Sequence, residues 1–169
     1  VIHCVADLLE QYRPPFVVVD PVMVATSGAR LLEDAALDAL RTRLLPLASL
    51  ITPNTPEAEL LTGRRIDTPD AADHATATLL ELGANAVLLK GGHLREGTRV
   101  IDRFDDGVAQ EIFMHPRLEL DAHGTGCTLS AAIAAQLCQG LSLLNACEAA
   151  IDYVARAIAN GQRPGQSDG

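Results

Sequence analysis

The clearest strand in this sequence is the stretch Ala86-Val87-Leu88-Leu89-Lys90-Gly91-Gly92-His93. Its first four residues are continuously apolar, which is typical of a strand buried on both faces of a parallel sheet. Its last four are polar or glycine, and Lys90 is the only lysine among the 169 residues. Ligands of open parallel sheets bind beyond the carboxyl ends of the strands. We therefore expect Lys90, Gly91 and Gly92 to contact a ligand, although a charge in such a place is often merely solvated.

A second buried strand is predicted at Phe16–Val19, a run of aromatic and β-branched residues that Asp20-Pro21-Val22 follows. The proline cannot donate a ladder hydrogen bond, so the strand ends there. In a parallel sheet, Asp20 then lies at the same edge as Lys90 and is placed for chemistry. The alternative is that Asp20 only caps a turn, as aspartates at strand ends often do.

A third buried strand is predicted at Ser49–Thr52, and Pro53-Asn54-Thr55-Pro56-Glu57 follows it. We expect a short helix here, with Thr55 as its N-cap and a proline at its first position. Glu57 then lies in the first turn, where a carboxylate suits the helix dipole. Asn54 and Glu57 are therefore either ligand-binding residues at the common sheet edge or merely the caps of this helix.

The remaining polar stretch is Asp121-Ala122-His123-Gly124-Thr125-Gly126-Cys127-Thr128-Leu129-Ser130, directly before an alanine-rich run. The run predicts a helix that begins near Thr125, and the first amides of a helix lack internal acceptors and attract anions. Glycines there let an anion approach the backbone, and the positive helix end lowers the pKa of a cysteine thiol. We interpret Gly124–Cys127 as a phosphate cradle that contains a reactive thiol. The alternative is a tight loop with an inert cysteine.

Amphipathic helices separate and follow these strands. They are predicted over residues 3–12, 31–44, 55–61, 68–82, 125–139 and 142–160, while 98–104 and 110–115 flank Asp105-Asp106-Gly107, a hairpin turn signal. Strands that alternate with helices predict an α/β layered domain with a mostly parallel sheet. The polar strand ends then face one crevice, because parallel strands deliver their carboxyl ends to one edge.

The composition is that of an ordinary globular protein, with 48% hydrophobic and 21% charged residues. Aromatic residues make up only 3%, so the core must be built from leucine, valine, isoleucine and alanine. The net charge of −9 argues against nucleic acid or an anionic membrane as the main partner. No apolar run approaches the roughly 20 residues that a membrane span needs. The four cysteines show no metal-binding spacing, so we expect a cytoplasmic protein without disulfides.

Two of these cysteines and three histidines are given structural rather than chemical roles. Cys138 and Cys147 fall in apolar helical surroundings and are predicted to be core residues. Three histidines are assigned to surface or turn positions, because nothing in the sequence pairs them; they are His3, His74 and His115.

The chemistry of the crevice follows from its residue types. The sequence has no GxxxxGK[ST] loop, no GxGxxG after a strand and no GxSxG elbow, which excludes P-loop, Rossmann and common serine hydrolase sites. Phosphoryl transfer on another scaffold remains. Asp20, Asn54 and Glu57 would organise Mg²⁺ and its waters. Lys90 would meet phosphate oxygens, and the amides of Gly124–Cys127 would stabilise the transferring group.

Four motifs in one order make the sequence resemble a known family. They are Asp20-Pro21-Val22-Met23-Val24-Ala25-Thr26-Ser27-Gly28, Thr52-Pro53-Asn54-Thr55-Pro56-Glu57, Leu89-Lys90-Gly91-Gly92-His93 and His123-Gly124-Thr125-Gly126-Cys127-Thr128-Leu129-Ser130. They closely resemble the hydroxymethylpyrimidine/phosphomethylpyrimidine kinases of thiamine biosynthesis, within the ribokinase-like superfamily. The resemblance implies a three-layer α/β/α fold and Mg²⁺-dependent phosphorylation by ATP. The acceptors would be 4-amino-5-hydroxymethyl-2-methylpyrimidine and then its monophosphate, which yields the diphosphate.

The resemblance also implies roles for individual residues. Cys127 stands where most ribokinase-like enzymes keep a catalytic aspartate, and it would be the general base. The anion hole would consist of Gly124, Thr125 and Gly126, and Val22 would face the pyrimidine. ATP and its metal would be bound by Asp20, Asn54, Glu57, Lys90, Gly91 and Gly92, with the metal held at Asp20 and Glu57 through water.

The resemblance covers almost the whole chain, as a single kinase domain at residues 1–161 and a flexible tail at 162–169. Family members carry further residues before the point where this chain begins, and that portion supplies the first strands and most contacts to the pyrimidine. We therefore expect the nucleotide-side part of the fold here, with the substrate side nearly absent. A homodimer that covers the sheet edge is expected as well. Asp121-Ala122 before the loop is a mild departure from the family pattern.

Two other functions stay open. A pyridoxal kinase has a similar order of motifs, but Cys127 and the run Met23–Gly28 favour the pyrimidine kinase. The second is a truncated, non-catalytic domain that binds nucleotide or a partner chain. Testing both alcohols as phosphoryl acceptors separates the first alternative, and ATP consumption with the pyrimidine separates the second.

Overall fold

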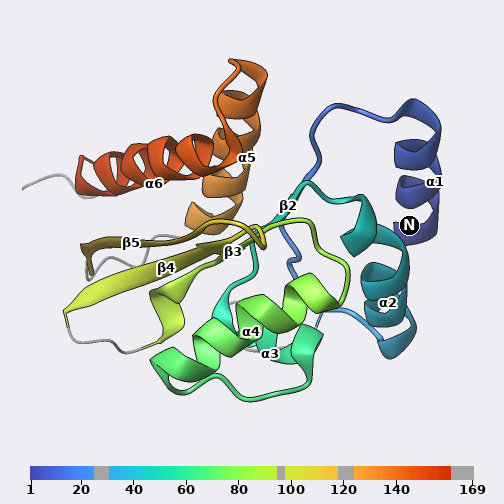
Figure 1. Ribbon diagram of the computed structural model, residues 1–169, viewed down its shortest axis with the longest axis horizontal. Coiled ribbons are helices and arrows are strands. Elements are labelled where there is room, and N and C mark those ends of the chain that lie inside the picture. Colours follow the sequence, from blue (N-terminus) through green and yellow to red (C-terminus); the bar gives the residue numbers. More distant parts are fainter. Residues whose placement is uncertain (25–30, 95–97, 118–123, 161–169) are drawn as a thin grey trace, which may run out of the picture.

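The computed structural model describes residues 1–24, 31–94, 98–117 and 124–160. Within these residues, five strands form one sheet in the order β1 to β5 (Figure 1). The strands are β1 (Val18–Val19), β2 (Leu50–Ile51), β3 (Val87–Leu89), β4 (Arg99–Asp105) and β5 (Gln110–Pro116). The α-helices around them are α1 (Ile2–Tyr12), α2 (Asp34–Ala39), α3 (Thr55–Thr62), α4 (Pro69–Glu81), α5 (Thr125–Cys138) and α6 (Leu143–Ala159). None of these described helices combines the length and the apolarity that crossing a membrane would require.

The first three strands run parallel, because helices return the chain to the same end of the sheet between them. Val18 of β1 lies opposite Leu50 of β2, and Ile51 of β2 lies opposite Val87 of β3. β4 and β5 form the predicted hairpin, and β4 is antiparallel to both β3 and β5. Four of the five described strands therefore share one direction, which confirms the prediction of an α/β domain with a mostly parallel sheet.

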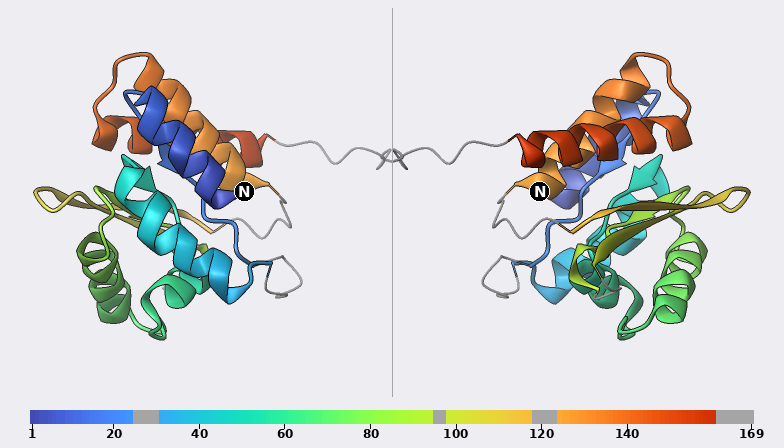
Figure 2. Two further views of the ribbon diagram at one scale, coloured as in Figure 1. Left: turned by 90° about the vertical axis from the view of Figure 1, so that its right-hand side faces the viewer. Right: turned by 90° about the vertical axis from the view of Figure 1, so that its left-hand side faces the viewer.

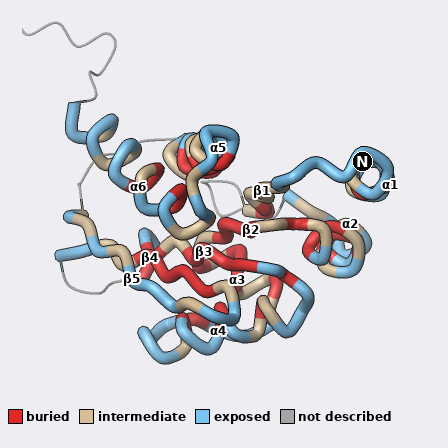
Figure 3. Tube along the Cα trace, turned by 45° about the horizontal axis from the view of Figure 1, so that its top comes forward, coloured by how far each residue is buried: buried red, intermediate tan, exposed pale blue. Residues whose placement is uncertain are grey.

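Side chains of the central strands alternate between two cores. Ile51, Val87 and Leu89 pack with α2, α3 and α4 on one face of the sheet, whereas Leu50 and Leu88 pack with α5 and α6 on the other. The alternation is the two-residue period of a strand. Figures 1 and 2 show the sheet between these two helical layers, and Figure 3 shows that the central strands are buried and that α1 is largely exposed. The expected three-layer α/β/α arrangement is present.

Helix α3 begins one residue earlier than predicted, with Asn54 rather than Thr55 as its N-cap. Asn54 Oδ1 accepts from the amide of Glu57 at 2.9 Å, and Glu57 Oε2 accepts from the amide of Asn54 at 2.8 Å. This reciprocal pair is a capping box, which satisfies two amides that the helix itself leaves free. Asparagine caps a helix at least as well as threonine, and the proline is accommodated one position later. The helix ends, as predicted, at Gly63.

The second predicted helix, over residues 31–44, is observed as two consecutive segments, and a third short turn follows them. A π-helical turn, Leu40–Leu44, follows α2, and a 3-10 turn, Leu45–Leu47, follows that. Helix α1 lies beside the π-helical turn, where Arg43 contacts Asp7 at 2.8 Å and Glu10 at 3.2 Å. Exposed ion pairs of this kind contribute little free energy, so they orient α1 more than they stabilise it.

Two assignments made from the sequence are wrong. Cys138, at the end of α5, is exposed. The alanines of α5 are spread around the helix, so its apolar pattern does not mark a single buried face. His115 on β5 has a partner, since its Nε2 lies 3.1 Å from Oδ2 of Asp102 on the neighbouring strand β4. Cys147 is buried as predicted, and burial raises its pKa to about 12.

Candidate functional site

Asp20 and Lys90 meet at the carboxyl ends of β1 and β3, across the end of β2. Lys90 Nζ lies 2.9 Å from Asp20 Oδ1, and the two side chains are only 15% and 14% exposed. Thr52 is the first residue after β2, and its Oγ1 lies 3.4 Å from the same Asp20 oxygen. The amide of Lys90 donates to the carbonyl of Pro53 at 2.9 Å. The parallel topology thus brings three strand ends together, as the sequence predicts.

The start of α5 lies directly beside Lys90. Gly124 is the N-cap, with a left-handed φ of 84°, and its carbonyl accepts from the amide of Thr128 at 2.9 Å. A Cβ added at Gly126 would lie 3.0 Å from Lys90 Nζ. Glycine at this position therefore lets the ammonium group lie close to the first helical turn, where a side chain would crowd it. Thr125 is the first residue of that turn.

Cys127 also lies in the first turn of α5, and its side chain is exposed. Hydrogen bonding to the Asp20 carboxylate, together with partial burial and the charge of Asp20, raises the pKa of the thiol, and Lys90 offsets this only in part. The predicted lowering of the pKa is therefore wrong for this arrangement. A full negative charge at hydrogen-bonding distance outweighs the roughly half charge of a helix terminus. We call Asp20, Thr52, Lys90, Gly126 and Cys127 the strand-end cluster.

Glu57 is 2% exposed and is held by backbone groups. Its Oε2 accepts from the amide of Asn54 at 2.8 Å. Burial raises the pKa of Glu57, while the amide of Asn54 and the charge of Lys90 act in the opposite direction. The capping role of Asn54 and Glu57 is thus observed. Glu57 is also close enough to the strand-end cluster for the charge of Asp20 to raise its pKa further.

The two glycines after β3 have different surroundings. Gly91 is buried at the start of a 3-10 turn, Gly91–His93 (η3), and a Cβ added there would overlap the carbonyl oxygen of Ile101 on β4. Its amide donates to Asp102 Oδ1 at 2.8 Å, so it is not directed at a ligand. Gly92 is exposed and has open space around it among the described residues. Gly91 is therefore a packing residue, and Gly92 is the one of the two that a ligand can reach.

Sequence reasoning missed a buried pair of hydroxyl groups behind the strand-end cluster. Thr52 Oγ1 lies 2.8 Å from Ser130 Oγ, and Ser130 Oγ donates to the carbonyl of Gly126 at 3.1 Å. Both side chains are buried. The pair connects the end of β2 to the first turn of α5 and so holds the helix start against the strand ends. The available signal was the spacing of Ser130, four residues after Gly126, which places it one turn further along the same helix face.

Val22 lies next to the strand-end cluster in the chain, with a side chain that is 47% exposed. Its amide donates to the carbonyl of Asp20 at 2.9 Å, so its backbone is held at the sheet edge. Whether it faces a pyrimidine stays a prediction. Several sequence-predicted features lie outside the described residues. They are the end of the motif that contains Val22, at 25–28, the Asp121-Ala122-His123 stretch before α5, and the tail at 162–169.

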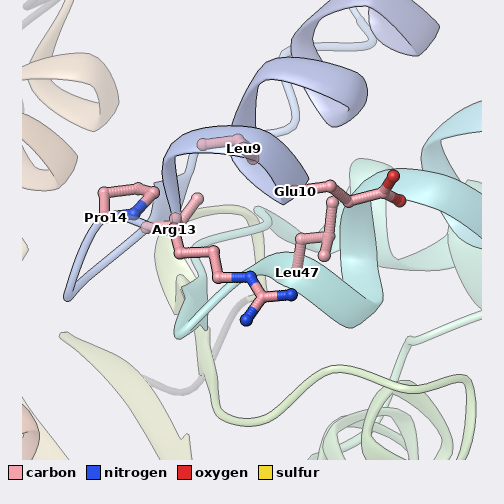
Figure 4. A pocket seen from close by; sticks show the side chains of 6 residues that line it. Leu9, Glu10, Arg13, Pro14 and Leu47 are labelled. Carbon is pink, nitrogen blue, oxygen red and sulfur yellow. The ribbon is translucent and has the colours of Figure 1, made fainter.

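Two observations limit where else a ligand could bind. In the part of the chain that the structure describes, no three His, Cys, Asp or Glu side chains gather closely enough to hold a metal ion. A hollow of about 290 Å³ lies at the end of α1 (Figure 4), lined by Leu9, Glu10, Arg13, Pro14, Val17 and Leu47. None of its lining residues belongs to the strand-end cluster. The candidate chemistry therefore rests on the cluster and on the start of α5.

Comparison with known sequences identifies relatives along the whole chain. The profile of the family described as phosphomethylpyrimidine kinase matches residues 1–169. The hydroxymethylpyrimidine/phosphomethylpyrimidine kinase of Rhizobium meliloti is 48% identical over 165 residues, which are 96% of this chain and 61% of that protein. The thiamine biosynthesis bifunctional protein ThiED of Geobacter sulfurreducens is 47% identical over 169 residues, which are 99% of this chain and 34% of that protein. The chain therefore spans less than two thirds of the length of these relatives.

Solved structures confirm the ribokinase-like fold that the motifs imply. The ADP complex of Bacillus subtilis pyridoxal kinase has a TM-score of 0.86 at 32% identity and covers 98% of this chain and 61% of its own. The phosphomethylpyrimidine kinase of Clostridium difficile has a TM-score of 0.80 at 37% identity and covers 93% and 63%. With the family profile matched over its whole length, the chain belongs to the phosphomethylpyrimidine kinase family.

Proposed function

We propose that this chain carries the phosphoryl-transfer site of an ATP-dependent kinase that phosphorylates hydroxymethylpyrimidine and then its monophosphate, as a step of thiamine biosynthesis. One observation carries the proposal: the ammonium group of Lys90 is held by Asp20 beside the first turn of α5, at a position without a side chain, Gly126. The names of the relatives support it, and so does a solved complex of Staphylococcus aureus pyridoxal kinase with AMP-PCP, at a TM-score of 0.88 and 31% identity.

Lys90 and the start of α5 would bind the phosphates of the nucleotide together. In a chain with a net charge of −9, an anion needs local positive groups, and these two meet at one place. The ammonium group supplies a compact full charge, and the free amides of the first helical turn supply directed donors. Gly124 and Gly126 let the phosphate oxygens reach those amides, because neither adds a side chain there.

Mg²⁺ fits the oxygen donors of this edge. The ion takes one or two carboxylates and keeps several waters. Asp20 and Glu57 are two such carboxylates, and they lie close enough for the charge of Asp20 to raise the pKa of Glu57. When bound, Mg²⁺ neutralises charge on the phosphates of the nucleotide.

Cys127 would accept the proton of the acceptor hydroxyl. It lies in the same helical turn as the glycines of the anion hole, and Lys90 is the neighbour that favours its thiolate. Lys90 would therefore have two tasks, which are to bind phosphate and to counter the effect of Asp20 on the thiol. A positioned base of this kind contributes roughly 10²- to 10⁴-fold to the rate.

The test is a phosphorylation assay with Mg·ATP and three separate acceptors: hydroxymethylpyrimidine, its monophosphate and pyridoxal. We expect the two pyrimidines to be phosphorylated, with the products identified by ³¹P NMR. We expect Lys90→Met to lose at least about 100-fold in activity and to bind ATP more weakly, because both tasks of the ammonium group are lost. ATP binding without transfer to any acceptor would favour the non-catalytic alternative.

Phosphorylation of pyridoxal is the second candidate function. It is favoured by the solved structures, since the pyridoxal kinases of B. subtilis and S. aureus superpose with TM-scores of 0.86 and 0.88. A kcat/KM for pyridoxal above that for hydroxymethylpyrimidine would decide for it. The same phosphate site serves both reactions, so this outcome would change the acceptor and leave the roles of Lys90 and the start of α5 in place.

A further inference from the structure

The turn that follows Lys90 is held by a buried carboxylate on the neighbouring hairpin. Asp102 on β4 is 4% exposed, and its two oxygens have different partners. Oδ1 accepts from the amide of Gly91 at 2.8 Å, and Oδ2 lies 3.1 Å from Nε2 of His115 on β5. Burying a carboxylate is costly unless its oxygens are hydrogen-bonded, and here both are. A buried carboxylate therefore holds the backbone of the residue directly after Lys90.

Two further contacts hold the same turn from the hairpin side. Arg117, just after β5, donates from Nη1 to the carbonyl of Gly92 at 2.6 Å and from Nη2 to the carbonyl of Leu94 at 2.8 Å. The backbone of Gly91 packs so closely on β4 that a Cβ there would overlap the carbonyl oxygen of Ile101. The turn is therefore fixed on the hairpin by the side chains of β4 and β5 and by direct backbone contact.

Lys90 stands between this turn and the rest of the sheet. Its amide donates to the carbonyl of Pro53 at 2.9 Å, which fixes its backbone on the side of β2. The amide of the next residue is fixed by Asp102 on the side of β4. The direction in which the Lys90 side chain leaves the sheet is set by these two opposed anchors.

We propose that Asp102 is a positioning residue for phosphoryl transfer: by holding the Gly91 amide, with His115 as its second partner, it aims the Lys90 ammonium group at the nucleotide phosphates. The inference rests on the proposed function. Asp102 does not contact the site of the reacting atoms, and it acts through the backbone of the turn. An alternative is that Asp102 contributes to folding alone, and the experiment must separate the two.

The experiment compares Asp102→Leu with Asp102→Asn in two independent measurements. The first is KM for Mg·ATP and kcat in the phosphorylation assay, and the second is hydrogen exchange of the Gly91 and Gly92 amides. Leucine removes both hydrogen bonds, whereas asparagine keeps an oxygen for the Gly91 amide. We expect Asp102→Leu to raise KM for Mg·ATP by about 5- to 100-fold, the cost of leaving a buried donor unpaired, and to speed exchange at Gly91. We expect Asp102→Asn to stay within about threefold of the wild type at high pH.

A pH series sharpens the comparison. The Asp102 carboxylate raises the pKa of His115, through its hydrogen bond and its charge, and the charge of Arg117 acts in the opposite direction. In Asp102→Asn the amide nitrogen can donate to a neutral His115 but faces a second donor once His115 is protonated. The KM of Asp102→Asn should therefore move away from that of the wild type as the pH falls from 9 to 5.5. A purely structural role predicts no such pH-dependent divergence.

Asp105 provides the matched control on the same strand. It is buried as well, and its oxygens accept from the amide of Gly107 at 2.8 Å and from Nε2 of Gln110 at 2.9 Å, at the far end of the hairpin. Asp105→Leu therefore removes an equivalent buried carboxylate without touching the Lys90 turn. We expect it to leave KM for Mg·ATP and exchange at Gly91 unchanged.

The outcomes separate the inference from the proposed function. Wild-type KM and wild-type Gly91 exchange in Asp102→Leu would overturn the positioning role, and so would an equal rise of KM in Asp105→Leu. A wild-type protein that neither binds nor turns over Mg·ATP would overturn the proposed function. In that case the exchange measurement still decides whether Asp102 holds the turn.

Discussion

Two glycine-containing segments adjoin Lys90, and the missing side chain has different consequences in them. In the turn after β3, Gly91 lets two backbones pack together, and its amide is consumed by Asp102. At the start of α5, Gly126 lets the flexible ammonium end of Lys90 come close to the first helical turn. One segment packs against rigid backbone, and the other packs against the movable end of a side chain that we propose binds the nucleotide phosphates. Glycine in a motif therefore indicates that something comes close, and only the fold decides whether this is rigid backbone or a movable charged group.

The largest effect is expected from Cys127→Ala at the start of α5. If the thiol is the base, turnover should fall by about 10²- to 10⁴-fold while the midpoint of thermal unfolding stays unchanged, because the side chain is exposed. Steady-state kinetics and a thermal melt check both parts. Cys138→Ala, also exposed and at the other end of α5, is the control and should be neutral in both. Unchanged turnover in Cys127→Ala would remove the base from the proposal.

In the turn after β3, Gly91→Ala should lower the stability of the fold. The added Cβ would overlap a backbone carbonyl that cannot move alone, so we expect a loss of about 3–5 kcal/mol in the free energy of unfolding. Gly92→Ala, one residue along and with open space around it, should cost less than about 1 kcal/mol. Urea denaturation of both variants measures the difference. Equal costs would mean that Gly91 is not the packing residue.

Gly126→Ala should reverse that pattern. The nearest atom to the new Cβ is the flexible end of Lys90, which can shift, and alanine is the better helix former by up to about 1 kcal/mol. We expect stability to be kept or slightly increased, and KM for Mg·ATP to rise by about tenfold, because the methyl group occupies the space next to the ammonium group. Isothermal titration with an ATP analogue checks the affinity. A stable variant with unchanged affinity would show that the close approach of Lys90 to Gly126 is not needed for nucleotide binding.

The smallest effect is expected at the pair of Asp102 and His115, which holds the turn after β3. Asp102 raises the pKa of His115 above its ordinary 6.5, so this stabilisation is fully present below about pH 6.5 and is lost as the pH rises through the raised pKa. His115→Gln should therefore lower the free energy of unfolding by about 1 kcal/mol at pH 5.5, and by less at pH 9. Chemical denaturation across this pH range follows the difference. A difference that does not change with pH would contradict a charged pair.

Much of the fold was predictable because local chemistry and topology agree. Continuous apolar runs, proline stops and helical periods place all five described strands and six α-helices within a few residues of where they are observed. The convergence of Asp20 and Lys90 followed from parallel topology alone. The N-cap of α3 was misplaced by one residue, because both Asn54 and Thr55 are good caps and local sequence does not rank them by geometry.

The contacts between segments far apart in the chain could not be predicted. The pairing of Asp102 with His115 depends on the register of the hairpin, and the pairing of Thr52 with Ser130 joins residues 78 positions apart. The pKa of Cys127 was predicted in the wrong direction for the same reason. A helix terminus is visible in the sequence, whereas the carboxylate that outweighs it comes from another strand.

The sequence by itself determined the α/β class, the common edge of the polar strand ends and the family resemblance, because these depend on residue type, periodicity and spacing along the chain. The tertiary structure decided which glycine packs on backbone and which on the Lys90 side chain, which cysteine is buried, and which carboxylate holds the Lys90 turn. Those properties depend on distances between elements. Such distances are set by how helices and strands pack, and no local pattern encodes them.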